Sequence, residues 1–343
     1  HAQRLVETGN VTALIGGVGD GQAQAIAKVA ERNKVPFFNI GSQSDAMRGA
    51  GCGRYTFHVE ASAAMYLDAL AMMGAEAGRK RWYIIYENTP EGVAMQARAV
   101  KAIAKHGNGG TVVGSSKVEV EQPIYYNEFN KVERETADVM LLLISAVDQI
   151  AFTAQQEGAQ LDITTLAYPD QISQTRDYIS SARQLAPEKN IPVRLALWET
   201  TFEGNPTAKD FNDRYTTRWS EPCDPTAWAC YHSIKMIYES ALATGSVAAD
   251  PLVKYLENPA TTFDIGKGPG VGFRPWDHQL RQPLYTLSID QEIEWVRIDY
   301  QTWVGLGKDA KQLPAPAANA AAAVAALDRF GDLAADSGCR MPA

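Results

Sequence analysis

The chain of 343 residues has no long hydrophobic run and no excess of positive charge. A transmembrane helix needs about 18 or more consecutive apolar residues, and no segment reaches that length. The formal net charge is −8, which argues against a nucleic-acid or anionic-membrane partner. We therefore expect a protein that neither binds nucleic acid nor inserts directly into a membrane.

Cysteine is scarce, and only Cys52, Cys223, Cys230 and Cys339 are present. No two of them have the Cys-x-x-Cys spacing of a zinc or redox motif. An even number is compatible with two disulfides in an oxidising compartment, and four thiols are the alternative. Cys52 follows a loop and Cys339 ends a tail that needs anchoring, so we expect a Cys52–Cys339 disulfide. Cys223 and Cys230 flank the start of a helix and are the expected second pair, Cys223–Cys230.

The motifs of common enzyme classes are also missing. There is no Gly-x-Ser-x-Gly elbow and no His-Glu-x-x-His sequence. His58-Val59-Glu60 matches one half of a deaminase signature, but the Pro-Cys-x-x-Cys half is absent. The glycines after the first strand resemble a dinucleotide-binding loop, yet no acidic residue follows the next strand at Ile40. We expect no enzyme, no catalytic residue and no cofactor, with a nucleotide-binding α/β enzyme as an alternative.

What is present is an alternation of strand and helix patterns, which begins at residues 11–45. Apolar strand patterns lie on both sides of a helical stretch at residues 22–33. The two strands end in loops of small or polar residues, at 16–21 and 41–45. Ligands bind at the carboxyl ends of parallel strands, where glycine allows close approach and a helix start offers N–H groups. The segment therefore predicts a small-molecule site built from loops.

The same alternation of strand and helix patterns continues to residue 198. The predicted strands span residues 81–86, 111–114, 138–144, 163–167 and 193–198, and the predicted helices span residues 93–106, 127–136, 148–158 and 173–185. The near-continuous apolar run at residues 138–144 is typical of a parallel strand that is covered on both faces.

Beyond Thr200 the pattern changes to predicted helices at residues 206–219, 225–244 and 251–257. The first two begin with Asn-Pro or Asp-Pro, which is a side-chain cap followed by proline at the first helical position. Residues 283–289 and 292–298 alternate like a hairpin that turns near residues 290–291. The tail from Gly307 is rich in proline and alanine, and we expect it to wrap the surface or to be partly disordered.

The order of strand, glycine loop, helix, strand and serine loop, followed by Tyr55–Val59 and a second α/β region, resembles a type I periplasmic binding protein. The resemblance covers about residues 1–300 and is strongest to proteins that serve branched-chain amino acid ABC transporters. The run Arg274-Pro-Trp-Asp-His-Gln-Leu-Arg-Gln-Pro283, with Tyr168-Pro169-Asp170 and Cys339-Arg340, is similar to one subfamily. That subfamily is the substrate-binding component encoded with pyrroloquinoline-quinone-dependent alcohol dehydrogenase systems.

The resemblance implies an α/β fold of the two-lobed type I periplasmic binding class. Each lobe would be a mostly parallel sheet flanked by helices, with a ligand cleft between the lobes that closes by hinge motion. Lobe 1 would comprise residues 1–57 and 201–286, lobe 2 residues 58–200 and 287–305, and residues 306–343 would form a C-terminal tail. The family's first strand–helix–strand unit would be missing before His1.

The resemblance also assigns the ligand-binding loops. In lobe 1 the gripping loops would contribute Gly19, Asp20, Gly21, Ser42, Gln43 and Ser44. In lobe 2 three successive strands would end at Glu87, Asn88, Ser145, Asp148, Tyr168 and Asp170, and Trp198 would add an aromatic surface. The alternative roles of these residues are ordinary turns, helix caps and, for the tryptophan, the core.

The ligand that these loops favour is not a plain α-amino acid. Asp20 stands where the amino-acid binders have serines, and an acid there repels a carboxylate, although it could instead only cap the helix that begins at Gln22. Asp170 matches the acid that pairs with a ligand ammonium. The matching tyrosines, however, are replaced by Thr89 and Ser145.

Two alternative ligand classes follow from the same residues. The acids Asp20, Glu87, Asp148 and Asp170 would suit a calcium or lanthanide ion or a metal chelate, with Asp20 and Asp170 as the metal ligands. The other alternative is an apolar ligand such as a lipid or a sterol.

The predicted function is that of a monomeric solute-binding protein in the periplasm. It would deliver or sense a small ligand for an ABC transporter linked to quinoprotein alcohol oxidation, and its partner would be the inner-membrane permease. In the distinctive run, Trp276, Asp277, His278 and Arg281 are expected to pack the hinge.

Overall fold

The computed structural model describes residues 1–185, 194–200, 202, 204–287, 296–298, 301–303 and 310–341. The chain divides into two compact units. Unit 1 comprises His1–Met65, Phe202–Pro283 and Pro314–Ala343, and unit 2 comprises Tyr66–Thr201 and Leu284–Leu313. Each unit is therefore assembled from segments that are far apart in the sequence. None of the helices in the described residues is both long enough and apolar enough to cross a membrane.

A parallel sheet forms the centre of unit 1. Its strands β1 (Leu14–Gly16), β2 (Phe37–Asn39) and β3 (Thr56–His58) pair in the order β1-β2-β3. Between β1 and β2 the chain forms α2 (Asp20–Asn33), which buries Ala23, Val29 and Ala30. The strands are short; β2 and β3 are fully buried, whereas β1 buries Leu14 and leaves Ile15 and Gly16 half-buried.

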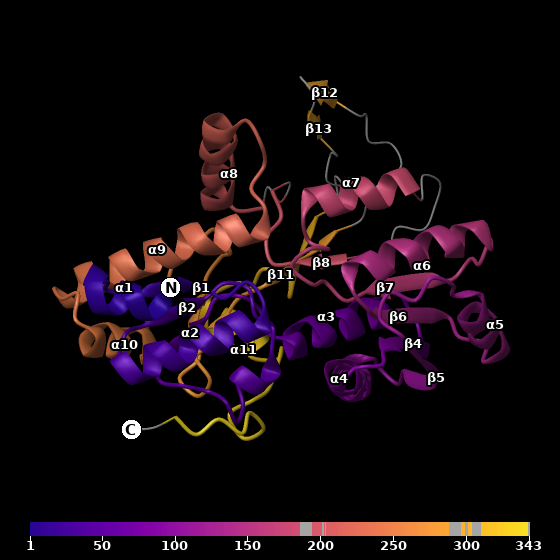
Figure 1. Cartoon of the computed structure of the whole chain (residues 1–343), viewed down its shortest axis with the longest axis horizontal. Coiled ribbons are helices and arrows are strands. Elements are labelled where there is room, and N and C mark those ends of the chain that lie inside the picture. Colours follow the sequence, from indigo (N-terminus) through magenta and orange to yellow (C-terminus); the bar gives the residue numbers. More distant parts are fainter. Residues whose placement is uncertain are drawn as a thin grey trace. The chain divides into compact units, whose positions relative to one another are not determined.

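The other elements of unit 1 come from all three of its segments (Figure 1). They are α1 (Ala2–Gly9), the 3₁₀ helix η1 (Asp45–Met47), α8 (Pro206–Trp219), α9 (Pro225–Thr244), α10 (Ala249–Glu257), β9 (Gly272–Phe273), β10 (Leu280–Arg281) and α11 (Ala320–Leu327). The predicted helices at 206–219 and 225–244 are confirmed, and Asn205 caps the first through Thr207 N at 2.9 Å. Asp224 makes no such side-chain cap.

The distinctive run Arg274–Pro283 fixes the chain around β3. The side-chain amides of Gln279 and Gln282 donate to the backbone carbonyls of residues 58–60 at 3.2, 2.5 and 3.0 Å. His278 stacks on Phe57, with ring centroids 4.3 Å apart. The two glutamine side chains therefore satisfy buried carbonyl groups at the end of β3.

The same run also holds the C-terminal segment. Three of its side chains donate to that segment, Arg274 to Phe330 O at 3.1 Å, Trp276 to Asp332 O at 3.3 Å and Arg281 to Asp328 Oδ1 at 2.6 Å. Asp277 forms a buried ion pair with Arg274. Residues 314–341 thus pack on unit 1 and include a helix, α11.

Cys52 and Cys339 form the expected disulfide, with the two Cα atoms 5.7 Å apart. It ties the C-terminal segment to the loop between β2 and β3 across a sequence separation of 287 residues. The prediction of a Cys223–Cys230 disulfide is wrong, because both residues remain thiols. Cys223 precedes α9 and its Sγ donates to Asp224 O at 3.4 Å, whereas Cys230 lies inside the helix, so the two thiols have different surroundings.

Unit 2 contains a four-stranded parallel sheet. Its strands pair in the order β5-β4-β6-β7, and they are β4 (Arg81–Glu87), β5 (Thr111–Val118), β6 (Val139–Leu143) and β7 (Thr164–Ala167). Every residue of β6 is buried, as its apolar run predicts. The chain leaves β4 toward β5 and leaves β6 toward β7, so the topological switch point lies between β4 and β6.

Helices cover both faces of this sheet (Figure 1). They are α3 (Ala63–Glu76), α4 (Pro90–His106), α5 (Tyr126–Arg134), α6 (Ala146–Gly158) and α7 (Arg176–Leu185). Helices α5 and α6 share one core cluster with the sheet through Phe129, Val132 and Phe152. Helix α3 was not predicted, because most of its residues are apolar and the sequence shows no amphipathic period.

A second, antiparallel sheet in unit 2 has the order β14-β11-β8. It consists of β8 (Arg194–Ala196), β11 (Leu284–Leu287) and β14 (Lys311–Leu313), and a separate pair joins β12 (Val296–Ile298) to β13 (Gln301–Trp303). The predicted hairpin between residues 283–289 and 292–298 is wrong for the described residues, since β11 pairs with β8 and β14 instead. The predicted turn at residues 290–291 lies outside the described residues.

Candidate functional site

The glycine loop after β1 brings the backbone to the sheet edge in unit 1. Gly17 and Gly19 have φ values of +85° and +109°, a region that side chains disfavour. A Cβ atom on Gly17 would also meet the Cβ of Ala23 at 2.9 Å. The loop therefore requires glycine to turn sharply into α2.

Asp20 lies in the first turn of α2 and contacts the loop after β2. Ser42 Oγ donates to Asp20 Oδ1 at 2.6 Å. The N-cap of the helix is Gly19, and no side chain caps this end, so the alternative that Asp20 only caps the helix is not what the structure shows. The positive end of the helix dipole favours the Asp20 carboxylate at this position.

The first turn of α2 presents open hydrogen-bond donors. The first backbone amide that finds an acceptor is Ala23 N, which donates to Gly19 O at 3.0 Å. Within the described residues, the N–H groups of Asp20, Gly21 and Gln22 therefore have no backbone acceptor, and these three residues are exposed. Helix ends of this kind bind ligand oxygen atoms.

The serine loop after β2 is shaped by a buried asparagine, Asn39. Its side-chain oxygen accepts from Ser42 N at 2.8 Å, and its side-chain nitrogen donates to Ser42 O at 2.8 Å. Gln43 and Ser44 follow and are half-buried. Ala63 N donates to Gln43 O at 2.8 Å, so the loop is also tied to the start of α3.

Arg48 is the main residue of this site that sequence reasoning missed. Its guanidinium is buried, and it donates to Ser42 O at 3.1 Å, Ser44 O at 2.9 Å, Glu60 O at 2.8 Å and Gln279 Oε1 at 2.6 Å. Burial lowers its pKa, although nearby acids act in the opposite direction. A lone arginine in a loop carries no sequence signal for such a role, since one of its partners lies 231 residues away.

In unit 2 the predicted acids gather at the start of α6, beside the switch point. Glu87 at the end of β4 accepts from Ser145 N at 2.6 Å, and Asp170 accepts from Ala146 N at 3.1 Å. Asp148 is only 2% exposed and accepts from Ser145 Oγ at 3.1 Å. The structure therefore brings these residues together, but each carboxylate satisfies groups of the protein itself.

The electrostatics of this cluster follow from its burial. Partial burial raises the pKa of Glu87, the hydrogen bond from Ser145 N lowers it, and the charges of Asp148 and Asp170 raise it further. Burial and the neighbouring Asp148 also raise the pKa of Tyr125. Thr89 and Ser145 stand where the resemblance to the amino-acid binders places tyrosines. In this structure they are the N-caps of α4 and α6.

The remaining predicted residues of unit 2 occupy different environments. Asn88 is exposed and donates to Glu119 Oε1 at 2.8 Å. Tyr168 is buried, and its ring lies 6.0 Å from that of Tyr66. Trp198 is 2% exposed and packs edge-on against Tyr285 at 5.7 Å.

The metal alternative gains no support from the described residues. Among them, no group of three or more histidine, cysteine or acidic side chains is placed to hold a metal ion. Asp20 belongs to unit 1 and Asp170 to unit 2. Both oxygens of Asp170 already accept backbone N–H groups, from Ala146 at 3.1 Å and Ser173 at 2.6 Å.

Several solved structures share this fold at low sequence identity. A branched-chain amino acid ABC transporter periplasmic ligand-binding protein from Burkholderia xenovorans LB400 has a TM-score of 0.77 at 15% identity, over 90% of this chain and 79% of its own. A branched-chain amino acid transporter substrate-binding protein from Streptococcus pneumoniae, in complex with isoleucine, has a TM-score of 0.71 at 16% identity, over 91% and 82%. A solute-binding protein from R. palustris, in complex with benzoate, has a TM-score of 0.67 at 17% identity, over 94% and 82%.

These likenesses confirm the predicted fold class, a type I periplasmic binding fold with parallel sheets flanked by helices. A comparison with curated protein sequences gives no significant match. Residues 1–292 match the profile of the periplasmic binding proteins. The match covers most of the chain, which therefore belongs to the periplasmic binding protein family.

Proposed function

We propose that this chain is the periplasmic solute-binding component of an ABC transporter, which delivers a small ligand to an inner-membrane permease or senses it. Family membership supports this proposal, and so do the loops at the carboxyl ends of β1, β2, β4 and β6.

The observation that carries the proposal is the pair of Asp20 and Ser42 beside the open amides of α2. A ligand here meets donors from the backbone and an acceptor from the Asp20 carboxylate. We infer that the ligand is a small neutral molecule that offers both a hydroxyl hydrogen and an acceptor oxygen. A carboxylate about 4 Å from Asp20 would instead lose about 4 kcal/mol at an effective dielectric constant of 20, which is about a thousandfold in affinity.

This ligand class distinguishes the chain from structural relatives that were crystallised with isoleucine or benzoate, since both ligands carry a carboxylate. It also agrees with the resemblance of the run Arg274–Pro283 to proteins encoded with quinoprotein alcohol dehydrogenases. We therefore infer that the ligand is an alcohol, a polyol or a neutral oxidation product of one. In this structure the run itself packs the interior of unit 1, so it supports the assignment only through the resemblance.

Calorimetric titration tests the ligand class. The probes are isoleucine, benzoate, 1,2-propanediol, calcium chloride and lanthanum chloride, added to the purified chain. We expect heat of binding with the diol and none with isoleucine or benzoate. Micromolar binding of isoleucine would overturn the neutral-ligand proposal, and binding of calcium or lanthanum alone would favour the metal alternative.

A further inference from the structure

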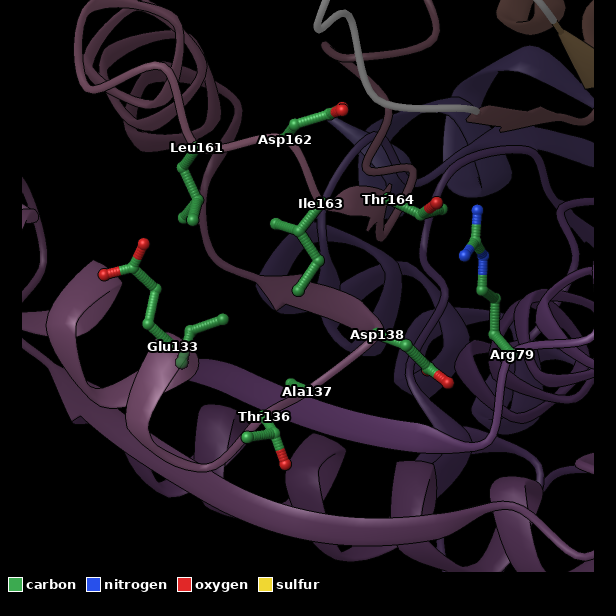
Figure 2. A pocket seen from close by; sticks show the side chains of 10 residues that line it. Arg79, Glu133, Thr136, Ala137, Asp138, Leu161, Asp162, Ile163 and Thr164 are labelled. Atoms are coloured by element: carbon green, nitrogen blue, oxygen red, sulfur yellow. The ribbon is translucent and has the colours of Figure 1, made fainter.

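A pocket of about 530 Å³ lies at the amino ends of the parallel strands in unit 2 (Figure 2). Its lining includes Arg79 before β4, Asp138 before β6, and Ile163 and Thr164 at the start of β7. Because the strands are parallel, this is the edge of the sheet opposite to Glu87 and Ser145. The pocket is therefore separate from the candidate site of unit 2.

The end of α3 presents Arg79 to this pocket. Gly78 has a φ of +75°, its N–H donates to Ala75 O at 3.0 Å, and Arg79 N donates to Gly74 O at 2.8 Å. These bonds form a Schellman motif, which ends the helix at a fixed angle. The backbone position of Arg79 is thus set before its side chain meets any ligand.

The guanidinium of Arg79 is not fully satisfied by the protein. Its Nε is buried and, among the described residues, donates to no acceptor. Figure 2 shows the guanidinium directed toward Thr164. Asp138, one of the acids of the lining, is already engaged, because its oxygens accept from Lys80 N at 3.0 Å and from Arg81 N at 2.9 Å. A buried charged donor without an acceptor is costly, and an anionic ligand removes that cost.

The rest of the lining determines which anion fits. Val132, Ala137, Leu161 and Ile163 provide apolar walls. The acids Glu133 and Asp162 are exposed, so water and salt screen their charges, and the remaining repulsion is about twice as large for a ligand with two negative charges as for one with a single charge. We propose that this pocket binds a small monocarboxylate with an apolar body, whose carboxylate pairs with Arg79. Arginine offers a planar fork of donors that suits a carboxylate.

This inference does not rest on the proposed function, since the two sites use different residues. Butyrate is the probe, and butyramide is a neutral control of the same size and shape. Inorganic phosphate tests whether a ligand with more negative charge binds more weakly. Binding to the purified chain is measured by saturation-transfer difference NMR with calorimetry. We expect butyrate to bind, and butyramide and phosphate to bind at least about tenfold more weakly.

Variants locate the site. Arg79→Gln should weaken butyrate binding by about tenfold or more, and Arg79→Lys should weaken it less because it retains the charge. Thr164→Val provides an independent test and should weaken binding by a few-fold. Arg134→Gln, at an exposed position of α5 outside the pocket, and Ser42→Ala in unit 1 should leave binding unchanged.

Thermal melting checks that each variant is folded. The proposal is overturned if butyrate does not bind the unaltered chain, or if it binds folded Arg79→Gln and Thr164→Val as well as it binds the unaltered chain. It is also overturned if Ser42→Ala, rather than Arg79→Gln, abolishes binding, because butyrate would then occupy the candidate site of unit 1.

Discussion

Ser42 Oγ lies 2.6 Å from Asp20 Oδ1, and this hydrogen bond joins the loop after β2 to the first turn of α2. Asp20 is exposed at the positive end of the helix. Ser42 is buried, and the side chain of Asn39 bonds both its backbone N–H and its backbone carbonyl. The serine therefore fixes the carboxylate beside the open amides of the helix. The hydrogen bond from Ser42 and the positive end of the helix dipole together explain why an acid is stable at this position.

Replacing Ser42 tests whether this hydrogen bond positions Asp20. Ser42→Ala should weaken binding of the neutral ligand by about three- to tenfold, the value of one hydrogen bond, and should change the free energy of unfolding by less than about 1 kcal/mol. Calorimetry and urea unfolding measure the two effects. Ser181→Ala, at an exposed position of α7, is the matched control and should change neither. Unaltered affinity in Ser42→Ala would show that the bond does not serve binding.

Arg48 should be far more important for stability than its position in a loop indicates. Arg48→Met removes four hydrogen bonds, to Ser42 O, Ser44 O, Glu60 O and Gln279 Oε1, although Asn39 still donates to Ser42 O and Gln279 still donates to Glu60 O. At about 1 kcal/mol or more for each, we expect a loss of about 3–5 kcal/mol in the free energy of unfolding, measured by urea titration. The control Arg134→Met should change stability by less than about 0.5 kcal/mol. A loss below about 1 kcal/mol for Arg48→Met would show that water replaces the guanidinium.

The disulfide between Cys52 and Cys339 should be the only one in the described part of the chain. Thiol titration of the unfolded, unreduced protein should therefore detect Cys223 and Cys230. Closure of a loop of 287 residues is expected to contribute about 5 kcal/mol in the chain-entropy model, so Cys339→Ser should lower stability by a large part of that amount. Detection of four thiols, or of none, would contradict this arrangement.

Stability should fall in acid through Asp68, which is buried between α3 and α4. Burial raises its pKa, but the hydrogen bond from His106 and the charges of Arg98 and Lys105 outweigh that effect, so its pKa is lowered. A folded-state pKa below the unfolded one stabilises the protein above the unfolded value, and the contribution is lost as the pH falls through the folded pKa. Asp68→Asn should thus cost about 3 kcal/mol at neutral pH.

The pH dependence separates this charge effect from lost packing. The difference between Asp68→Asn and the unaltered chain should shrink progressively as the pH falls below about 4, where the unfolded aspartate becomes protonated, toward the lowered pKa of the folded state. Urea unfolding at a series of pH values measures it. Asp213→Asn, in an exposed pair with Lys209, is the control and should have little effect at any pH. A difference that stays constant down to pH 3 would assign the loss to packing alone.

Strong local signals made much of the fold predictable. The apolar run of β6 and the Asn-Pro and Asp-Pro starts of α8 and α9 each depend on neighbouring residues only. The hairpin was wrong because β11 finds its partners in β8 and β14, which are not its sequence neighbours. Helix α3 was missed because it is apolar on nearly all sides, so periodicity could not reveal it.

The candidate site was predictable only in part, for a related reason. The loops that contain Asp20 and Ser42 were identified because glycine and serine follow apolar strands. The sequence did not predict the hydrogen bond from Ser42 to Asp20 or the bonds that Arg48 makes with the serine loop. Both depend on contacts between segments. The clustering of Glu87 and Asp170 was expected from the strand ends, whereas their bonds to the first turn of α6 depend on the register of the folded sheet.

Native mass spectrometry of the protein purified from its own host tests the central claim most directly. We expect the unaltered protein to carry a neutral small-molecule adduct, and we expect Asp20→Asn and Ser42→Ala each to reduce the bound fraction while Ser181→Ala does not. An adduct that persists undiminished in Asp20→Asn and Ser42→Ala would contradict the account. So would an adduct whose mass matches an α-amino acid.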